Sequence, residues 1–412
     1  MLFSVVRFTY NGWIEQLYIA PTYFFTYYGF DWVKPLNPFG IYLTFTVMGI
    51  SALFILFGLF YRLSSAIFFI TFTYVELIDK TNYLNHYYFV SLIAFILIWL
   101  PAHHYFSLDA LFAKKHTTRT RYFNIWILKF QLGIVYFFAG VAKINYDWLI
   151  RAQPLQLWLS ALIHKPFVGW IFKFKLTAYL FSWFGMIYDI LIPVFLSFKQ
   201  TRAAAYTAVV FFHLMTLYLF PIGVFPWVMI GSTLIFFPEK YHIKFIESLK
   251  GLMKSHRLAV ESKSLLKSSR MVYGFWAMFI IAQIALPLRH LIYPGNLFWT
   301  EQGYRFSWRV MLMEKAGYVT YRITDGDKDF WISPYDYLTP QQEKMMATQP
   351  DMILQFAHYL KESLADEGII DPVITAEAYV TLNGAPSRQF IDPTINLTQV
   401  KRGFHHKDWI IE

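Results

Sequence analysis

The sequence QLGIVYFFAGVAKINYDW, residues 131–148, is typical of an apolar helix that ends at a lysine. The residues that precede Lys143 at helical spacing are small or polar and share one face of the helix: Gly140, Tyr136, Gly133 and Lys129. We expect that face to look into a bundle of helices rather than at lipid. An amine at its end is costly unless it is wetted, paired or neutral, which makes Lys143 a candidate for chemistry.

Lys143 also has a purely structural interpretation. A lysine at the end of a spanning helix often reaches to the headgroup region, where Asp147 could pair with it and Trp148 could lie. Spacing alone favours this anchor role. An outward ion pair between Lys143 and Asp147 would support the anchor, whereas an apolar pocket shared with Asn85 would support catalysis.

The composition indicates a membrane protein. Of 412 residues, 57% are hydrophobic and 15% are charged, whereas soluble domains carry about 25% charged residues. The net charge of +10 is better explained by basic cytoplasmic loops than by nucleic acid, because Lys and Arg cluster between apolar segments. Cysteine is absent, which excludes disulfides and Cys-ligated metal sites, and no metal is expected.

The lengths of the apolar segments predict eight or nine membrane spans. The first, about residues 3–20, is interrupted by Arg7, Asn11 and Glu15 and is expected to be weak or half-inserted. The other spans are expected at about 39–61, 63–79, 87–102, 123–143, 176–197, 203–220, 222–237 and 271–292. The predicted fold is therefore mainly α, a polytopic helical bundle over residues 1–293.

Three basic segments predict the orientation of the bundle: 111–122, 199–202 and 239–270. Even numbers of predicted spans separate them, so all three can be cytoplasmic. This arrangement places the N-terminus inside and the end that carries Lys143 on the outer side. The longest basic segment is expected to form an amphipathic helix on anionic lipid.

Residues 294–412 are expected to form an outer-side α+β domain. The segments 317–324 and 374–384 alternate like strands, with DGDK and NGAP as turn signals. Residues 352–367 read as a helix. Its expected role is a lid or a docking surface for the bundle.

Further polar positions lie at or within the predicted spans. Asn85 and His86 are adjacent at an outer junction, where the histidine could move a proton, although a helix cap and an interfacial side chain are the simpler interpretation. His213 lies near the middle of a span and is either functional or paired to a neighbouring hydroxyl. Asp189 is either a buried partner for a basic group or a device that fixes how the bundle packs.

Six strings together resemble one known family. They are DKTNYLNHYYF, HHYFSLDAL, FQLGIVYFFAGVAKINYDW, FFHLMTLYLFPIGVF, WTEQGYRFSWRVM and RQFIDP, which begin at residues 79, 103, 130, 211, 299 and 388. Their order and spacing are similar to those of the vitamin K-dependent gamma-glutamyl carboxylases, whose membrane part is the HTTM domain. The similarity covers nearly the whole chain.

The resemblance implies a lyase that couples two reactions: epoxidation of a reduced vitamin K, a quinol, and peptidyl-glutamic acid carboxylation with CO2. A glutamate γ-proton is too weakly acidic for a side-chain base, so a strong base must be generated from oxygen and the quinol. In the family a lysine that matches Lys143 starts this by removing a quinol proton, which requires a neutral amine. Burial lowers lysine pKa values by about 3 to 5 units, so the role is physically sensible.

The resemblance also assigns other residues. Asn85 matches the asparagine that hydrogen-bonds the quinol, and His86 matches a histidine of the carboxylation half. Tyr136 and His213 are further expected cofactor contacts, although the role of the family histidine at 213 is left open. The expected contacts of a quinone face or a glutamyl peptide, with packing as the equal alternative, are Trp299, Tyr304 and Trp308.

Departures from the animal enzymes limit what can be carried over. The chain has no cysteine, Ala142 stands where they have a second lysine, and Gly303 replaces a leucine. Epoxidation is therefore better supported than carboxylation. A bacterial inner membrane is expected, with menaquinol or phylloquinol as the quinol and menaquinol favoured. A quinol monooxygenase without carboxylation, and a non-catalytic membrane protein that binds lipid or peptide, remain alternatives.

Overall fold

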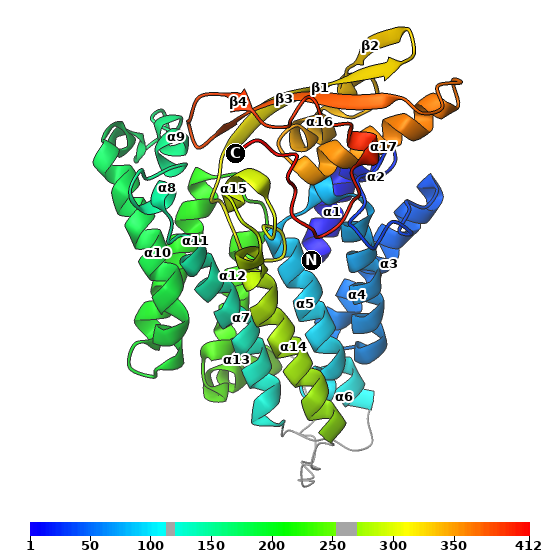
Figure 1. The fold of residues 1–412 in the computed structure, drawn as a ribbon. Helices are drawn as coiled ribbons and strands as arrows, with labels where there is room; N and C mark the ends of the chain where they lie inside the picture. The colour runs from blue at the N-terminus through cyan, green and yellow to red at the C-terminus, as the bar shows by residue number, and fades with distance from the viewer. Residues whose placement is uncertain (113–119, 253–269) are drawn as a thin grey trace.

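A computed structural model describes residues 1–112, 120–252 and 270–412 of the chain. A bundle of helices forms one layer, and a small domain with a four-stranded sheet covers one end of it (Figure 1). This arrangement confirms the predicted class, a mainly helical membrane protein with a C-terminal α+β part.

Six helices of the described residues are long and apolar enough to cross a membrane. They are α3 (Pro38–Phe57), α4 (Tyr61–Ile78), α7 (Tyr122–Ala142), α10 (Lys175–Ser197), α11 (Arg202–Leu219) and α14 (Arg270–Leu288), the last of which continues as a 3-10 turn to Ile292. Two shorter apolar helices fall at predicted spans, α5 (Asn85–Trp99) and α12 (Phe225–Thr233). Eight of the nine predicted segments are therefore apolar helices of the bundle.

The first predicted span, 3–20, is wrong as a continuous helix. Two short helices replace it, α1 (Leu2–Tyr10) and α2 (Trp13–Tyr18), separated by Gly12 in the left-handed region at φ 69°. Nine residues reach only about 14 Å, half of the hydrocarbon thickness. Both helices pack against α3, and because neither is long enough to span a membrane, the parity argument for an inner N-terminus is lost.

The two ends of the bundle differ in character. The short helix α6 (Leu108–Phe112) and the helix α13 (Glu239–Leu252) lie at the end opposite the sheet (Figure 1). They flank the basic segments, of which residues 113–119 and 253–269 lie outside the described residues. The α13 helix begins the segment that was predicted to lie on the membrane surface.

The ends of α3 show how local sequence fixes a helix. Asn37 accepts a hydrogen bond from the Gly40 amide at 2.8 Å, and Pro38 occupies the first helical position, where no amide donor is lost. The helix ends at Gly58, whose φ of 62° suits glycine.

The outer part is built on an antiparallel sheet with strand order β2-β1-β3-β4. The strands are β1 (Lys315–Asp325), β2 (Lys328–Ile332), β3 (Val373–Leu382) and β4 (Arg388–Gln389). The predicted DGDK turn joins β1 to β2, and the NGAP turn follows β3. Alternate residues of β3 are buried, including Ile374, Ala376 and Ala378, which is the pattern expected for a sheet with one covered face.

Helices connect the sheet to the bundle. Below the sheet lie α16 (Pro340–Met346) and α17 (Pro350–Ala365), while α8 (Tyr146–Leu149), α9 (Leu155–Ser160) and α15 (Leu297–Thr300) lie near the same end of the bundle (Figure 1). The predicted docking role of the 352–367 helix is confirmed by ring contacts of Tyr23 with Phe356 and Tyr359.

The closest approach of α7 to α10 predicts an unequal effect of two alanine substitutions. A Cβ at Gly140 would lie 2.6 Å from Ile190 Cγ1 and 2.8 Å from the Ile190 amide nitrogen, whereas a Cβ at Gly133 would meet nothing nearer than Pro193 Cβ at 3.7 Å. We expect Gly140→Ala to cost about 1–3 kcal/mol because the helices must separate. Gly133→Ala, the matched control, should be neutral or slightly stabilising because alanine favours helix.

Thermal unfolding of the two purified variants in the same detergent measures this difference. Equal midpoints for Gly140→Ala and Gly133→Ala would show that the helices do not approach as closely as the structure indicates.

Candidate active site

The centre of the bundle holds a buried ion pair. Lys143 Nζ lies 2.6 Å from Asp189 Oδ2 and donates to the Ala139 carbonyl at 3.1 Å. Only 6% of Lys143 and 5% of Asp189 are exposed. Asp189 is on α10, so the pair joins the two helices that meet at Gly140. The sequence-based expectation that this face of α7 looks into the bundle, and that Asp189 is a buried partner for a base, is confirmed.

The anchor interpretation of Lys143 is wrong. Asp147 does not pair with Lys143; it binds Arg151 at 3.1 Å and accepts from Asn383 at 2.9 Å. Trp148 is buried, and its indole lies 5.4 Å from Lys143 Nζ. The chain turns away after Lys143 because Asn145 caps the next short helix by accepting from the Trp148 amide.

A second polar contact lies deeper on the same face of α7. Tyr136 Oη is 2.9 Å from His213 Nε2, and both residues are buried. His213 therefore has the hydroxyl partner that the sequence allowed. Its other ring nitrogen, Nδ1, is buried without a hydrogen-bond partner among the described residues, so an unsatisfied polar atom remains in the bundle.

The Asn85–His86 pair faces the same region from α5. The His86 and His213 rings each lie 5.6 Å from the ring of Phe225 on α12. Asn85 does not cap its helix: its side chain donates to the Arg309 carbonyl at 2.9 Å and accepts from Tyr83 Oη at 3.1 Å. The capping alternative is therefore wrong, and Asn85 is fixed by the outer part.

The predicted residues do not form one hydrogen-bonded cluster. Within the described residues no hydrogen bond joins Lys143 to Asn85 or His86. Ring packing connects the two groups instead. The ring of Tyr136 lies 6.2 Å from the ring of Tyr188, which is the neighbour of Asp189. Tyr136 also contacts His213, whose ring packs against Phe225. The structure thus gathers side chains of α5, α7, α10, α11 and α12 around one packed centre.

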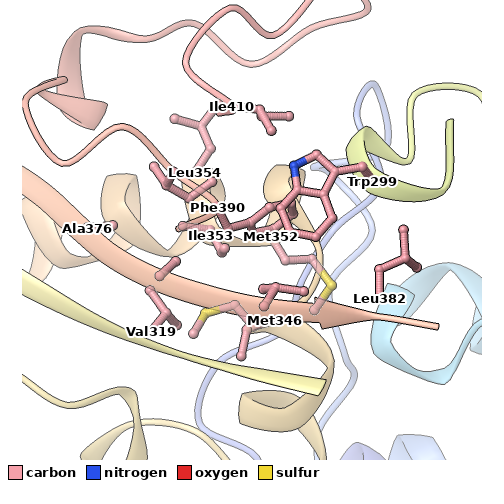
Figure 2. Packing of buried hydrophobic residues seen from close by; sticks show 14 of the residues in the cluster. Trp299, Val319, Met346, Met352, Ile353, Leu354, Ala376, Leu382, Phe390 and Ile410 are labelled. Carbon is pink, nitrogen blue, oxygen red and sulfur yellow. The ribbon is translucent and has the colours of Figure 1, made fainter. Parts of the chain in front are cut away.

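The aromatic segment of the outer part divides into two environments. Trp308 enters the bundle and stacks on Tyr88 at 4.9 Å. Trp299 instead lies in the core below the sheet among Phe390, Met352 and Ile410, with its indole nitrogen donating to the Ile411 carbonyl (Figure 2). Tyr304 packs against Phe298 at the edge of that core. Packing is therefore the role that the position of Trp299 supports.

The backbone around Trp308 is strained. Phe306 and Trp308 have φ angles of 58° and 61°, and Glu301 and Met311 are also in the left-handed region, which bulky residues rarely adopt. Such strain persists only where packing fixes it, and it concentrates at functional sites. The indole nitrogen of Trp308 is buried without a partner among the described residues.

Gly303, a departure from the animal family, has a structural reason. Its φ is 84°, and a Cβ there would lie 2.9 Å from His290 Cα. A leucine at this position would collide with the turn that follows α14.

Two cavities are described, and neither touches the Lys143 pair. One of about 150 Å³ lies between α9 and the start of α10, next to Lys173 and Lys175. The other, of about 30 Å³, lies between α1, α3 and α4 beside Glu76. Neither cavity is lined by Lys143, Asn85 or His86, and the Phe225 ring lies against the rings of His86 and His213.

The residues at the packed centre nevertheless suit a quinol. His213 Nδ1 and Trp308 Nε1 are buried polar atoms without partners among the described residues, and aromatic rings alternate with aliphatic side chains around them. A quinol offers two hydroxyls and a flat ring, which satisfy polar atoms and pack on aromatic faces.

A charged cluster that sequence reasoning missed fixes the outer part to the bundle. Asp351, in the first turn of α17, lies 2.8 Å from Lys80 Nζ and 2.9 Å from Arg305 Nη1. Burial opposes ionisation of Asp351, but Arg305, Lys80 and Lys407 outweigh it and hold the pKa of this carboxyl well below its usual value. Burial lowers the pKa of Lys80 to about 8.

Comparison with known families follows this architecture. Residues 1–241 match the HTTM domain, and residues 268–412 match the lumenal domain of vitamin K-dependent gamma-carboxylase. No solved structure matches the chain. The two matches cover most of the sequence in the order expected for a carboxylase, and the resemblance of the six strings is confirmed. The chain is a multi-pass membrane protein that belongs to the vitamin K-dependent gamma-carboxylase family.

Proposed function

We propose that the protein carboxylates glutamyl side chains of a protein or peptide and couples this to epoxidation of a membrane quinol. The observation that carries the proposal is the buried contact between Lys143 and Asp189 in the centre of the bundle. Family membership supports the general activity, and the buried amine supports a proton-transfer role in this particular chain.

The chemistry explains why a buried amine is needed. With oxygen, the reduced vitamin K supplies a base strong enough to take the glutamyl γ-proton, and the reaction yields epoxide, water and a γ-carboxylated glutamate from CO2. The protein must remove one quinol proton to begin. General bases of this kind contribute about 10²–10⁴-fold to a rate.

Asp189 gives Lys143 a way to become neutral without leaving its site. Transfer of one proton from Nζ to Oδ2 converts the ion pair to an amine and a carboxylic acid, with no change in net charge. The neutral Nζ can then accept a proton from a quinol hydroxyl, while Asp189 holds the first proton.

We assign supporting roles to the remaining residues. Asn85, Tyr136 and His213 would bind the quinol oxygens, and His86 would serve the carboxylation step. Tyr304 and Trp308 would present an aromatic surface to the quinol or the glutamyl side chain. The packed aromatic walls would exclude water, which would otherwise quench a strong base and a carbanion.

The location follows from the substrates. The quinol would come from the lipid, with menaquinol of a bacterial inner membrane as the proposed source, and the peptide would enter from the outer, periplasmic side, where we place residues 294–412. The described helices at the edges of two basic segments, α6 and α13, lie at the opposite end of the bundle, which agrees with a cytoplasmic position for that end.

The purified protein in nanodiscs tests the function directly. It is incubated with a reduced short-chain vitamin K, oxygen, labelled bicarbonate and a glutamate-rich peptide, and epoxide and fixed label are measured together. We expect both products. Epoxide without label on any glutamyl peptide would indicate a quinol monooxygenase. Neither product, at the level of a Lys143→Ala variant, would leave a non-catalytic protein that binds lipid or peptide.

A further inference from the structure

Arg309 is a buried cation without an acidic partner. Three lysines or arginines are buried in the described part of the chain: Lys80, Lys143 and Arg309. Lys80 pairs with Asp351, and Lys143 pairs with Asp189. No carboxylate of the described residues pairs with Arg309, which is 7% exposed. An unpaired buried charge is unfavourable, so its retention calls for an explanation.

The neighbours of Arg309 do not replace a carboxylate. Its guanidinium has five N–H donors, and its one side-chain contact among the described residues is from Nη2 to His290 Nδ1 at 2.9 Å. Its Nε is buried without a partner. The same His290 nitrogen lies 2.9 Å from the Pro287 carbonyl. If Nδ1 donates to that carbonyl, it cannot accept from Arg309.

A second cation, Arg289, acts electrostatically on Arg309. Burial lowers the pKa of Arg309 to about 10, with Tyr304 acting against the shift and Arg289 with it. Arg309 therefore remains protonated at neutral pH. Arg289 differs from it because its guanidinium donates to two backbone carbonyls, those of Leu286 and Arg305. Within the described residues, neither Arg289 nor Arg309 is paired with an acid, whereas the neighbouring Arg305 pairs with Asp351.

Arg309 is also held next to the candidate catalytic residues. Its backbone carbonyl accepts from Asn85, the neighbour of His86. It follows Trp308, which is inserted into the bundle against Tyr88. The strained backbone of residues 306–311 fixes this placement. The guanidinium lies beside His290, just after α14, so an anion bound by Arg309 would lie between that turn and the segment whose backbone holds Asn85.

We propose that Arg309 binds the side-chain carboxylate of the glutamyl substrate and thereby selects glutamate. The proposal rests on the proposed function. A guanidinium matches a carboxylate with two parallel N–H donors, and it is less strongly hydrated than an ammonium. The reaction requires a glutamyl carboxylate near the carboxylation residues, and Arg309 is the buried cation there that lacks a partner.

Binding in the absence of quinol and oxygen tests the proposal without turnover. A short peptide with one glutamate and the same peptide with glutamine are titrated into the full-length protein in nanodiscs of neutral lipid. We expect the wild type to prefer the glutamyl peptide by at least tenfold. Arg309→Gln should lose this preference, and Arg309→Lys should keep part of it. Arg322→Gln is the matched control, because Arg322 pairs with Asp329 on the exposed side of the sheet.

Three outcomes would overturn the assignment. One is an unchanged preference in Arg309→Gln. Another is a wild type that binds both peptides equally. The third is a preference that disappears when anionic lipid is added to the nanodisc, which would mean that a lipid phosphate occupies the site. A glutamyl peptide with a photoreactive residue beside the glutamate should crosslink to the wild-type protein within residues 301–313. Crosslinks elsewhere would also reject the site. This result does not depend on whether the variants fold.

Turnover separates this proposal from the proposed function. With active protein, Arg309→Gln should raise the KM for peptide at least tenfold and leave the KM for quinol unchanged. Glutamate-selective binding that depends on Arg309, without epoxide or fixed label in the wild type, would retain the binding site and reject the carboxylase.

Discussion

Replacing Lys143 with methionine is expected to lower epoxide formation by about 10³-fold, within the range for loss of a general base. Methionine keeps an unbranched side chain, one atom shorter than lysine, but cannot accept a proton. Fixed label should fall with the epoxide because the strong base is no longer made. The measurement is the coupled assay in nanodiscs, with both products followed over the same time.

Lys143→Arg is the informative control. Arginine can preserve the contact with Asp189 and the packing between α7 and α10, but a guanidinium does not become neutral in proteins. We therefore expect a folded and inactive protein. If Lys143→Arg retains the wild-type rate, Lys143 holds the bundle together electrostatically and is not the base.

The sequence was sufficient to predict the packed face of α7. Gly140, Tyr136 and Lys143 share a face by spacing alone, and all three are buried as expected. Periodicity predicts which side of a helix is covered, and an intramembrane charge predicts a partner. The identity of the partner, Asp189, remained one of several options, because its contact with Lys143 spans 46 positions along the chain.

The failures have equally physical causes. The first segment is apolar enough for a span, but Gly12 turns the chain, and the two short helices are stabilised by packing on α3. The packing around His86 and His213 depends on how aromatic side chains such as Phe225 fill space, which no periodic pattern encodes. Arg309 lay within a string used for the resemblance, and its missing acidic partner is visible only once the chain is folded.

The contact between the outer part and the bundle was likewise invisible in the sequence. Lys80 and Asp351 are separated by 271 positions, and Arg305 reaches the same carboxylate from the strained segment. One carboxylate thus joins the end of α4, the aromatic segment and the start of α17. Each of these charged residues is ordinary in the sequence, and only the folded chain brings them together as ion pairs that connect three elements.

Asp351→Asn is therefore expected to destabilise the protein by about 3 kcal/mol at neutral pH, because removal of the acid leaves Lys80 and Arg305 facing each other. The Asp351 side chain is 29% exposed, which places the effect at the lower end for a buried pair. The matched control is Asp329→Asn. Its partner Arg322 is about half exposed, so that substitution should cost less than about 1 kcal/mol.

The depressed pKa of Asp351 predicts how the stability difference between the wild type and Asp351→Asn changes with pH. A carboxyl whose folded pKa is depressed contributes stability above its unfolded pKa of about 4, and that contribution is lost as the pH falls through the folded value. The gap in thermal midpoint between wild type and Asp351→Asn should therefore stay constant from pH 7 to about pH 5 and narrow below about pH 4. A gap that closes already near pH 6 would assign the effect to a histidine. The charge of Asp351 would then not stabilise the contact between the end of α4, the aromatic segment and the start of α17. Apolar packing would hold these three elements together.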